Sequence, residues 1–84
     1  MTDHAPEAVA AWLKSCVEDL SGKDVPALDQ DIFETGVIDS FGAIELIERM
    51  EGRYAIRFDE ADFLSPRFKT VRGLAELIAE KTPA

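Results

Sequence analysis

Apolar residues recur at helical spacing in the first part of the chain. The stretch begins near Pro6 and Glu7, which suit a first helical turn, and stops at Ser21 and Gly22. The apolar positions that share one face are Val9, Leu13, Cys16, Val17 and Leu20. This pattern predicts an amphipathic helix from about residue 6 to residue 21.

Two further stretches show the same period. One begins at Asp39 and Ser40, where aspartate is a favoured N-cap, and ends near Gly52 or Arg53; its apolar residues include Ile44, Leu46, Ile47 and Met50. The other follows a capping threonine, and its apolar residues are Val71, Leu74, Ala75 and Ile78. Within this last helix we expect Gly73 to cost about 1 kcal/mol relative to alanine.

The segments between these helices are irregular. From Lys23 to Asp39, proline, glycine and acidic residues are mixed with apolar ones too irregularly for a helix, which predicts a long loop held down by buried side chains. Residues 54–58 alternate like a strand, but no other strand could pair with them. The spacing of Asp59 and Asp62 predicts a short capped turn, which Ser65–Pro66 ends.

These elements predict an all-α fold: a small bundle of three main helices plus one short helix, with a long loop between the first two main helices. A chain of 84 residues has apolar material for one core only. We therefore expect a single domain over residues 1–84, ordered from about 6 to 81 and frayed at 82–84.

The charge balance indicates which partners suit the chain. The chain has nine Lys and Arg and seventeen Asp and Glu, so its net charge is −8. This charge repels nucleic acids and anionic lipid and favours basic protein surfaces as partners. No apolar run approaches the roughly 20 residues of a membrane span, and no signal peptide is recognisable. Because Cys16 is the single cysteine, we expect no internal disulfide, and without a signal peptide we expect a cytoplasmic protein. We also expect a monomer.

Few residues are suited to catalysis. The only histidine, His4, precedes the first helix in an end expected to be mobile, so no base is placed to activate a serine. Cys16 falls on the apolar face of its helix, which favours a small buried side chain over a reactive thiol. Independent nucleophilic catalysis is therefore not expected.

The acidic stretch after Asp29 does not form a calcium loop. A twelve-residue loop starting there would place Phe33 at a ligand position, Glu34 where glycine is needed and Ser40 where glutamate is needed. The sequence therefore indicates no metal site.

One short motif, Gly36-Val37-Ile38-Asp39-Ser40-Phe41, places a serine at the opening of a helix. On local grounds Asp39 and Ser40 could simply cap that helix. The wider context, however, resembles the acyl carrier protein family. The resemblance rests on an amphipathic first helix, residues 32–40, the Ile44-Glu45-Leu46-Ile47 run, residues 54–58 and a closing amphipathic helix.

The resemblance implies a prosthetic group on Ser40. In that family a phosphopantetheinyl transferase moves 4′-phosphopantetheine from coenzyme A onto the motif serine, and the terminal thiol then holds acyl groups as thioesters. Ser40 needs no internal base, because the transferase supplies one together with Mg²⁺. A helix N-terminus also favours the phosphodiester that results. The resemblance therefore implies a carrier and not an enzyme.

Two further sets of residues are implied for such a carrier. Partner enzymes, including those that load and transfer the acyl group, would use basic patches to contact Asp39, Phe41, Ile44, Glu45, Glu48 and Glu51. The glutamates could instead form a merely solvated face, and Phe41 could be exposed or buried. An apolar cargo could enter a cleft between the second helix and the loop, lined by Phe33, Ile38, Ile44 and Met50.

Three residues depart from the common carrier pattern. Glu48 stands where many fatty-acid carriers have an apolar contact residue, and Arg49 and Arg53 interrupt an acidic helix. We expect a dedicated fatty-acid, polyketide or related biosynthetic pathway, although the arginines could simply pair with neighbouring glutamates. The sequence leaves the cargo open, because fatty acyl, polyketide, aryl, aminoacyl and D-alanyl carriers share this architecture.

Two other functions compete with the carrier. A small acidic helical adaptor could bind a basic partner protein without any prosthetic group and use Ser40 only as a cap. A hydrolase using Ser40 as its nucleophile is disfavoured by the missing base.

Overall fold

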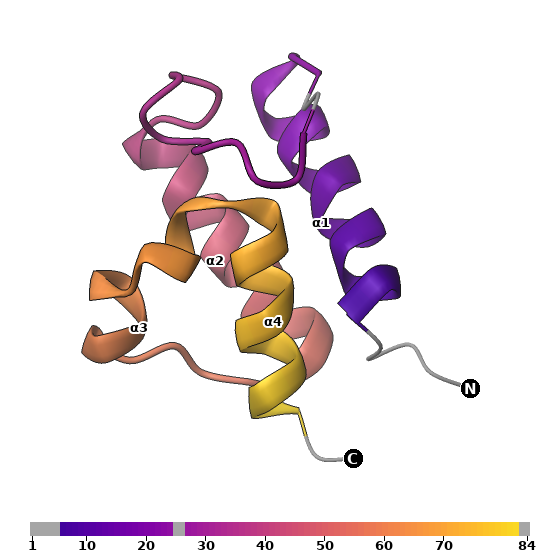
Figure 1. Cartoon of the computed structure of the whole chain (residues 1–84), viewed down its shortest axis with the longest axis vertical. Coiled ribbons are helices and arrows are strands. Elements are labelled where there is room, and N and C mark those ends of the chain that lie inside the picture. Colours follow the sequence, from indigo (N-terminus) through magenta and orange to yellow (C-terminus); the bar gives the residue numbers. More distant parts are fainter. Residues whose placement is uncertain (1–5, 25–26, 83–84) are drawn as a thin grey trace.

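The computed structural model describes residues 6–24 and 27–82, which form helices and connecting loops without a strand. The elements are α1 (Pro6–Ser21), α2 (Ser40–Tyr54), α3 (Glu60–Leu64), the 3₁₀ helix η1 (Pro66–Lys69) and α4 (Val71–Lys81) (Figure 1). The predicted all-α bundle is confirmed, with three main helices, one short α-helix and a long loop after α1. The 3₁₀ turn was not predicted.

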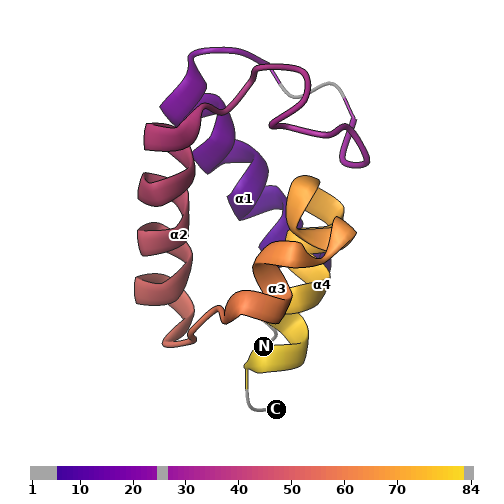
Figure 2. The same cartoon turned by 90° about the vertical axis from the view of Figure 1, so that its left-hand side faces the viewer.

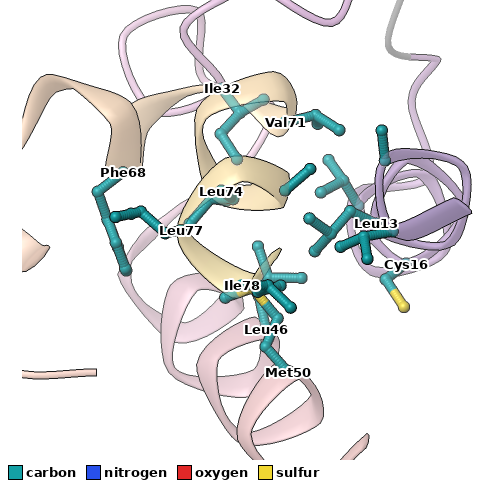
Figure 3. Packing of buried hydrophobic residues seen from close by; sticks show 14 of the residues in the cluster. Leu13, Cys16, Ile32, Leu46, Met50, Phe68, Val71, Leu74, Leu77 and Ile78 are labelled. Carbon is teal, nitrogen blue, oxygen red and sulfur yellow. The ribbon is translucent and has the colours of Figure 1, made fainter. Parts of the chain in front are cut away.

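The core lies where α1, α2 and α4 meet. Figure 3 shows Leu74 and Ile78 of α4 facing Leu13 of α1 and Leu46 of α2. The largest fully buried side chains are Leu13, Ile32, Leu46, Met50, Leu74, Ile78, Val9, Val17 and Val71. Each contributes about 1.5–3 kcal/mol by leaving water. Seen from the side, α2 forms one edge of the molecule and leaves its outer face uncovered by other helices (Figure 2).

The loop between α1 and α2 is held down as predicted. Ile32 is fully buried, and its amide donates to the carbonyl of Lys69 at 2.9 Å. The amide of Arg72 donates to the carbonyl of Leu28 at 3.0 Å. These two bonds tie the loop to η1 and to the start of α4. Residues 25–26, which the prediction placed in this loop, lie outside the described residues.

The chain turns sharply after α2. Ala55 adopts a left-handed conformation, with φ 54° and ψ 46°, and the amide of Ile56 donates to the carbonyl of Glu51 at 3.3 Å. The amide of Phe58 donates to the Glu51 carboxylate at 2.9 Å. This segment is therefore fastened to α2 and not paired as a strand, as expected, and α2 ends slightly later than predicted, at Tyr54.

Two predicted helix starts are confirmed. Asp59 and Asp62 form a capping box, in which each carboxylate accepts from the other residue's amide at 3.0 and 2.9 Å. The hydroxyl of Thr70 accepts from the amide of Gly73 at 2.9 Å. Both caps satisfy amides that a helix start leaves without a partner.

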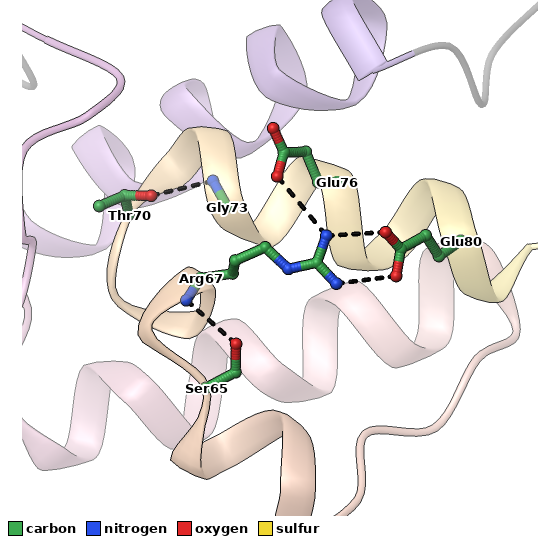
Figure 4. A network of polar contacts seen from close by, with 6 residues as sticks. All are labelled: Ser65, Arg67, Thr70, Gly73, Glu76 and Glu80. Atoms are coloured by element: carbon green, nitrogen blue, oxygen red, sulfur yellow. Dashed lines mark hydrogen bonds and ion pairs between the residues drawn. The ribbon is translucent and has the colours of Figure 1, made fainter.

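The expectation that Gly73 merely weakens α4 is wrong. A Cβ at this position would lie within 3.0 Å of the Arg67 backbone, so glycine is what allows η1 to approach α4. The Arg67 side chain reinforces this contact by bonding both oxygens of Glu80, at 2.7 and 2.8 Å (Figure 4). The hydrogen bond from Arg67 holds the pKa of Glu80 below its ordinary value.

The expected fraying of the C-terminal end is wrong for Thr82. This residue is buried, and its hydroxyl donates to the carbonyl of Ile78 at 3.0 Å, so it closes the last turn of α4. Residues 83–84 lie outside the described part, as do residues 1–5, which include His4. No helix in the described ranges has the length and apolarity needed to cross a membrane.

Candidate functional site

Ser40 is the first residue of α2, and its side chain is exposed. The helix is capped by the residue before it, because the Asp39 carboxylate accepts from the amide of Gly42 at 2.8 Å. Within the described part of the chain the Ser40 hydroxyl has no hydrogen-bond partner. The cap is therefore provided by Asp39, and the Ser40 hydroxyl is available at the surface.

The loop fixes the backbone that leads to Ser40. Val37 and Ile38 are buried, and the amide of Ile38 donates to the carbonyl of Ile32 at 2.8 Å. Gly36 has a φ of 78°, a region that favours glycine, and its amide donates to the carbonyl of Phe33 at 3.1 Å. This hydrogen-bonded turn places Ser40 directly after a buried segment.

The surface next to Ser40 is both apolar and acidic. Phe41 is 83% exposed and Ile44 is 57% exposed. Of the two alternatives that the sequence left for Phe41, exposed or buried, the structure shows the exposed one. Glu45 and Glu48 are exposed, and neither takes part in an ion pair within the described ranges. Exposed aromatic and aliphatic side chains beside unpaired carboxylates are typical of a contact surface for basic partners.

Glu51 differs from the other glutamates of α2. Its side chain is half-buried, and one carboxylate oxygen accepts from the Phe58 amide at 2.9 Å. The carboxylate thus fastens the segment after α2, a structural role that the sequence did not indicate. Its predicted contact with a partner stays a prediction.

The two arginines of α2 contact α1 and not the neighbouring glutamates. Arg49 Nη1 lies 3.3 Å from the carboxylate of Asp19. The Arg53 guanidinium lies over the ring of Trp12, 5.5 Å from its centroid, and 5.6 Å from that of Tyr54. The cationic groups therefore stay at the junction of α1 and α2.

Cys16 is buried as predicted and is free. Burial raises the pKa of its thiol, and a hydrogen bond with Arg49 opposes this only in part. The thiol is therefore protonated at neutral pH, which fits a packing role better than a reactive one.

Two hollows flank the start of α2 on the side that faces α1. The smaller, of about 200 Å³, lies between Leu20, Lys23, Ile38 and Asp39, among others. The larger and more open one, of about 480 Å³, is lined by Leu20, Asp39, Phe41, Gly42, Glu45 and Arg49. Both lie next to the motif that contains Ser40.

The four residues predicted to line an acyl cleft lie in different environments. Ile38 and Met50 are buried, Phe33 is half-buried and Ile44 is exposed. Only Ile38 among them lines either hollow described above. The structure does not bring the four around one opening, and the cleft stays a prediction.

Comparison with known proteins identifies the family. The family model for the phosphopantetheine attachment site matches residues 11–78, a range that includes the whole motif around Ser40. The chain belongs to the phosphopantetheine-binding carrier proteins. This confirms the resemblance to acyl carrier proteins.

Several relatives of this chain are named more specifically, as D-alanyl carrier proteins. The D-alanyl carrier protein of Streptococcus sanguinis is 35% identical over 73 residues, which are 86% of this chain and 92% of the relative. That of Streptococcus thermophilus is 33% identical over 73 residues, with the same coverage. That of Lactococcus lactis is 35% identical over 68 residues, 79% of this chain and 86% of the relative.

The cofactor of this carrier family is a covalently attached 4′-phosphopantetheine, and the start of α2 fits it. A phosphodiester on an exposed hydroxyl there would face the positive end of a 15-residue helix. The Asp39 carboxylate accepts from the amide of Gly42, whereas the amides of Ser40 and Phe41 have no partner in the described chain. Those two amides are donors of the kind that an anion needs.

Proposed function

We propose that Ser40 carries the phosphopantetheine arm and that the chain presents an acyl group to partner enzymes without itself catalysing a reaction. The observation that carries this proposal is the free, exposed Ser40 hydroxyl beside a separate cap, Asp39. When bound, the arm supplies a terminal thiol that holds the acyl group as a thioester.

The protein's own residues hold and surround the attachment point. The buried Val37 and Ile38 fix the backbone before Ser40, and Asp39 keeps the first turn of α2 closed. Phe41 and Ile44 offer apolar contact to a partner, and the nearby carboxylates attract basic patches. The expected partners are a phosphopantetheinyl transferase and the enzymes that load and unload the carrier.

We further propose that the cargo is a small amino acid of the D-alanine type. The support is the likeness to D-alanyl carrier proteins across most of both chains, at about a third identity. A dedicated pathway of this kind also agrees with the departures at Glu48, Arg49 and Arg53 from the pattern of general fatty-acid carriers. Fatty-acid or polyketide cargo is the competing possibility.

Intact mass spectrometry tests the attachment site. After incubation with coenzyme A and a phosphopantetheinyl transferase, the wild type should gain the mass of one phosphopantetheinyl group, and Ser40→Ala should gain none. Ser15→Ala, which removes an exposed serine of α1, should be modified like the wild type. Unmodified wild type would favour the adaptor function, and a modified Ser40→Ala would place the arm elsewhere.

A loading assay tests the cargo. The holo-protein is incubated with ATP and with ligases that activate D-alanine, L-alanine or octanoate, and the acylated mass is followed over time. We expect D-alanine to be loaded fastest. Preferential loading of octanoate would contradict the amino-acid cargo while leaving Ser40 as the attachment site.

A further inference from the structure

Four phenylalanine rings from different parts of the chain form a cluster at the side of α3. Phe33 comes from the long loop, Phe58 from the segment after α2, Phe63 from α3 and Phe68 from η1. Phe68 lies at the centre: it stacks with Phe33 at 6.2 Å between centroids and meets Phe58 and Phe63 edge to face at 5.6 and 5.1 Å. Such pairs prefer these geometries and add to the gain from burial.

One ring of the cluster lies beside the α2 face that begins at Ser40. Ser40, Ile44 and Glu51 are four and seven residues apart along α2, so they share one face of the helix. The Glu51 carboxylate binds the amide of Phe58, which fixes one ring of the cluster beside the far end of that face. Figure 2 shows the segment after α2 running from the end of this helix to α3.

The side chains behind this face are buried. Phe58 and Phe68 are buried, and Leu46 and Met50 of α2 are almost completely inaccessible to solvent. The two hollows beside Asp39 open on the α1 side of α2, and no ring of the cluster lines them. A chain reaching inward from the Ser40 face would therefore meet rings that are already packed.

We infer that the aromatic cluster keeps alkyl chains out of the bundle, and that Phe33 and Phe63 determine the class of cargo: short or polar acids held in solvent. The inference rests on the proposed attachment at Ser40. Phe33 and Phe63 are suitable positions for a test, because Phe33 is half-buried and Phe63 is 44% exposed. Either ring can therefore be removed with less loss of stability than the ring of Phe68. An apolar cavity left by a ring stays dry and accepts an apolar ligand.

The test compares thermal stability with and without an alkyl cargo. The transferase attaches phosphopantetheine from coenzyme A or octanoyl-phosphopantetheine from octanoyl-coenzyme A, and mass spectrometry verifies each product. The octanoyl and unacylated forms of the wild type should melt within about 1 °C of each other. For Phe33→Ala the octanoyl form should melt about 4 °C or more above the unacylated form, since the chain fills the cavity.

Two further variants complete the comparison. Phe63→Ala should show a similar gain and replaces Phe33→Ala if that variant does not fold. Leu64→Ala, at a position that is 78% exposed, should behave like the wild type. Because each variant is compared with its own unacylated form, a general loss of stability does not change the readout. A stabilised octanoyl wild type, or folded ring variants without any gain, would overturn the inference.

A second measurement separates this inference from the attachment site. Free octanoyl-pantetheine is titrated into unmodified wild type and Phe33→Ala, and the methyl resonances of the core leucines are followed by NMR. Shifts in Phe33→Ala alone support the exclusion of alkyl chains by the cluster, whereas shifts in both proteins or in neither overturn it. Failure of Ser40 modification contradicts only the proposed function, because this titration does not need the covalent arm.

Discussion

Helices α4 and α2 use their apolar residues differently. Six of the eleven residues of α4 are buried, but only three of the fifteen residues of α2 are. The large apolar side chains that α2 leaves at the surface, Phe41 and Ile44, lie one and four residues after the exposed serine. The comparison shows that α4 contributes mainly to the core, whereas the outer face of α2 is available for contact with partners.

The largest expected effect comes from adding one methyl group to each helix. Gly73→Ala forces a Cβ into the Arg67 backbone and should lower the free energy of unfolding by about 3 kcal/mol. Gly52→Ala, where a Cβ meets nothing within 4 Å, should raise it by up to about 1 kcal/mol. Urea denaturation measures both variants. Equal effects would remove the distinction between the two helices.

Charge reversal on α2 should change function and not stability. Glu45→Lys should slow modification of Ser40 about fivefold at low salt, because the carboxylate is exposed and unpaired and steers basic partners. Glu7→Lys, in the first turn of α1, makes the same change of net charge away from the site. Rates measured from low to high salt should converge as screening increases. A wild-type rate that is independent of salt would contradict steering.

The cap of α2 allows its structural and electrostatic contributions to be separated. Asp39→Ala should lower the free energy of unfolding by about 1 kcal/mol, because the amide of Gly42 loses its acceptor. Asp39→Asn keeps an acceptor and should be nearly neutral for stability, yet it should slow modification by removing a charge beside Ser40. Denaturation and transferase kinetics on both variants check this. If Asp39→Asn were as unstable as Asp39→Ala, the cap would depend on charge.

The smallest expected effect is a pH dependence of the free energy of unfolding that arises from Asp62. Burial acts to raise the pKa of Asp62, but the hydrogen bonds from Lys81 and from Asp59 outweigh it and lower the pKa. A carboxyl group with a lowered pKa in the folded state stabilises the protein above its unfolded value of about 4 and loses this contribution as the pH falls further. Asp62→Asn should therefore flatten part of the loss of stability below pH of about 4. An unchanged pH profile in urea denaturation would contradict this.

Much of the fold could be predicted because its signals are local. The caps at Asp39, Asp59 and Thr70 each act within three residues, so sequence spacing alone indicates them. The apolar period of α1 likewise predicted the burial of Cys16. The motif around Ser40 is a local signal too, and its position at the start of a helix follows from the cap before it.

The remainder depends on contacts between distant segments. The need for glycine at position 73 arises from the approach of Arg67, and the attachment of Arg49 to Asp19 joins residues that are thirty positions apart. The aromatic cluster unites four segments, so the spacing of its members carries no periodic signal. For this reason the sequence gives no sign that Phe33 packs against the ring of Phe68.

The contact between Trp12 and the end of α2 provides an optical probe. Trp12 is the only tryptophan, and its ring meets that of Tyr54 edge to face at 5.4 Å, with Arg53 above it. Tyr54 ends the helix that Ser40 begins, about 21 Å away along the axis. The emission wavelength of Trp12 should therefore stay unchanged when a partner changes only the surroundings of Ser40. It should shift when the whole helix tilts away from α1.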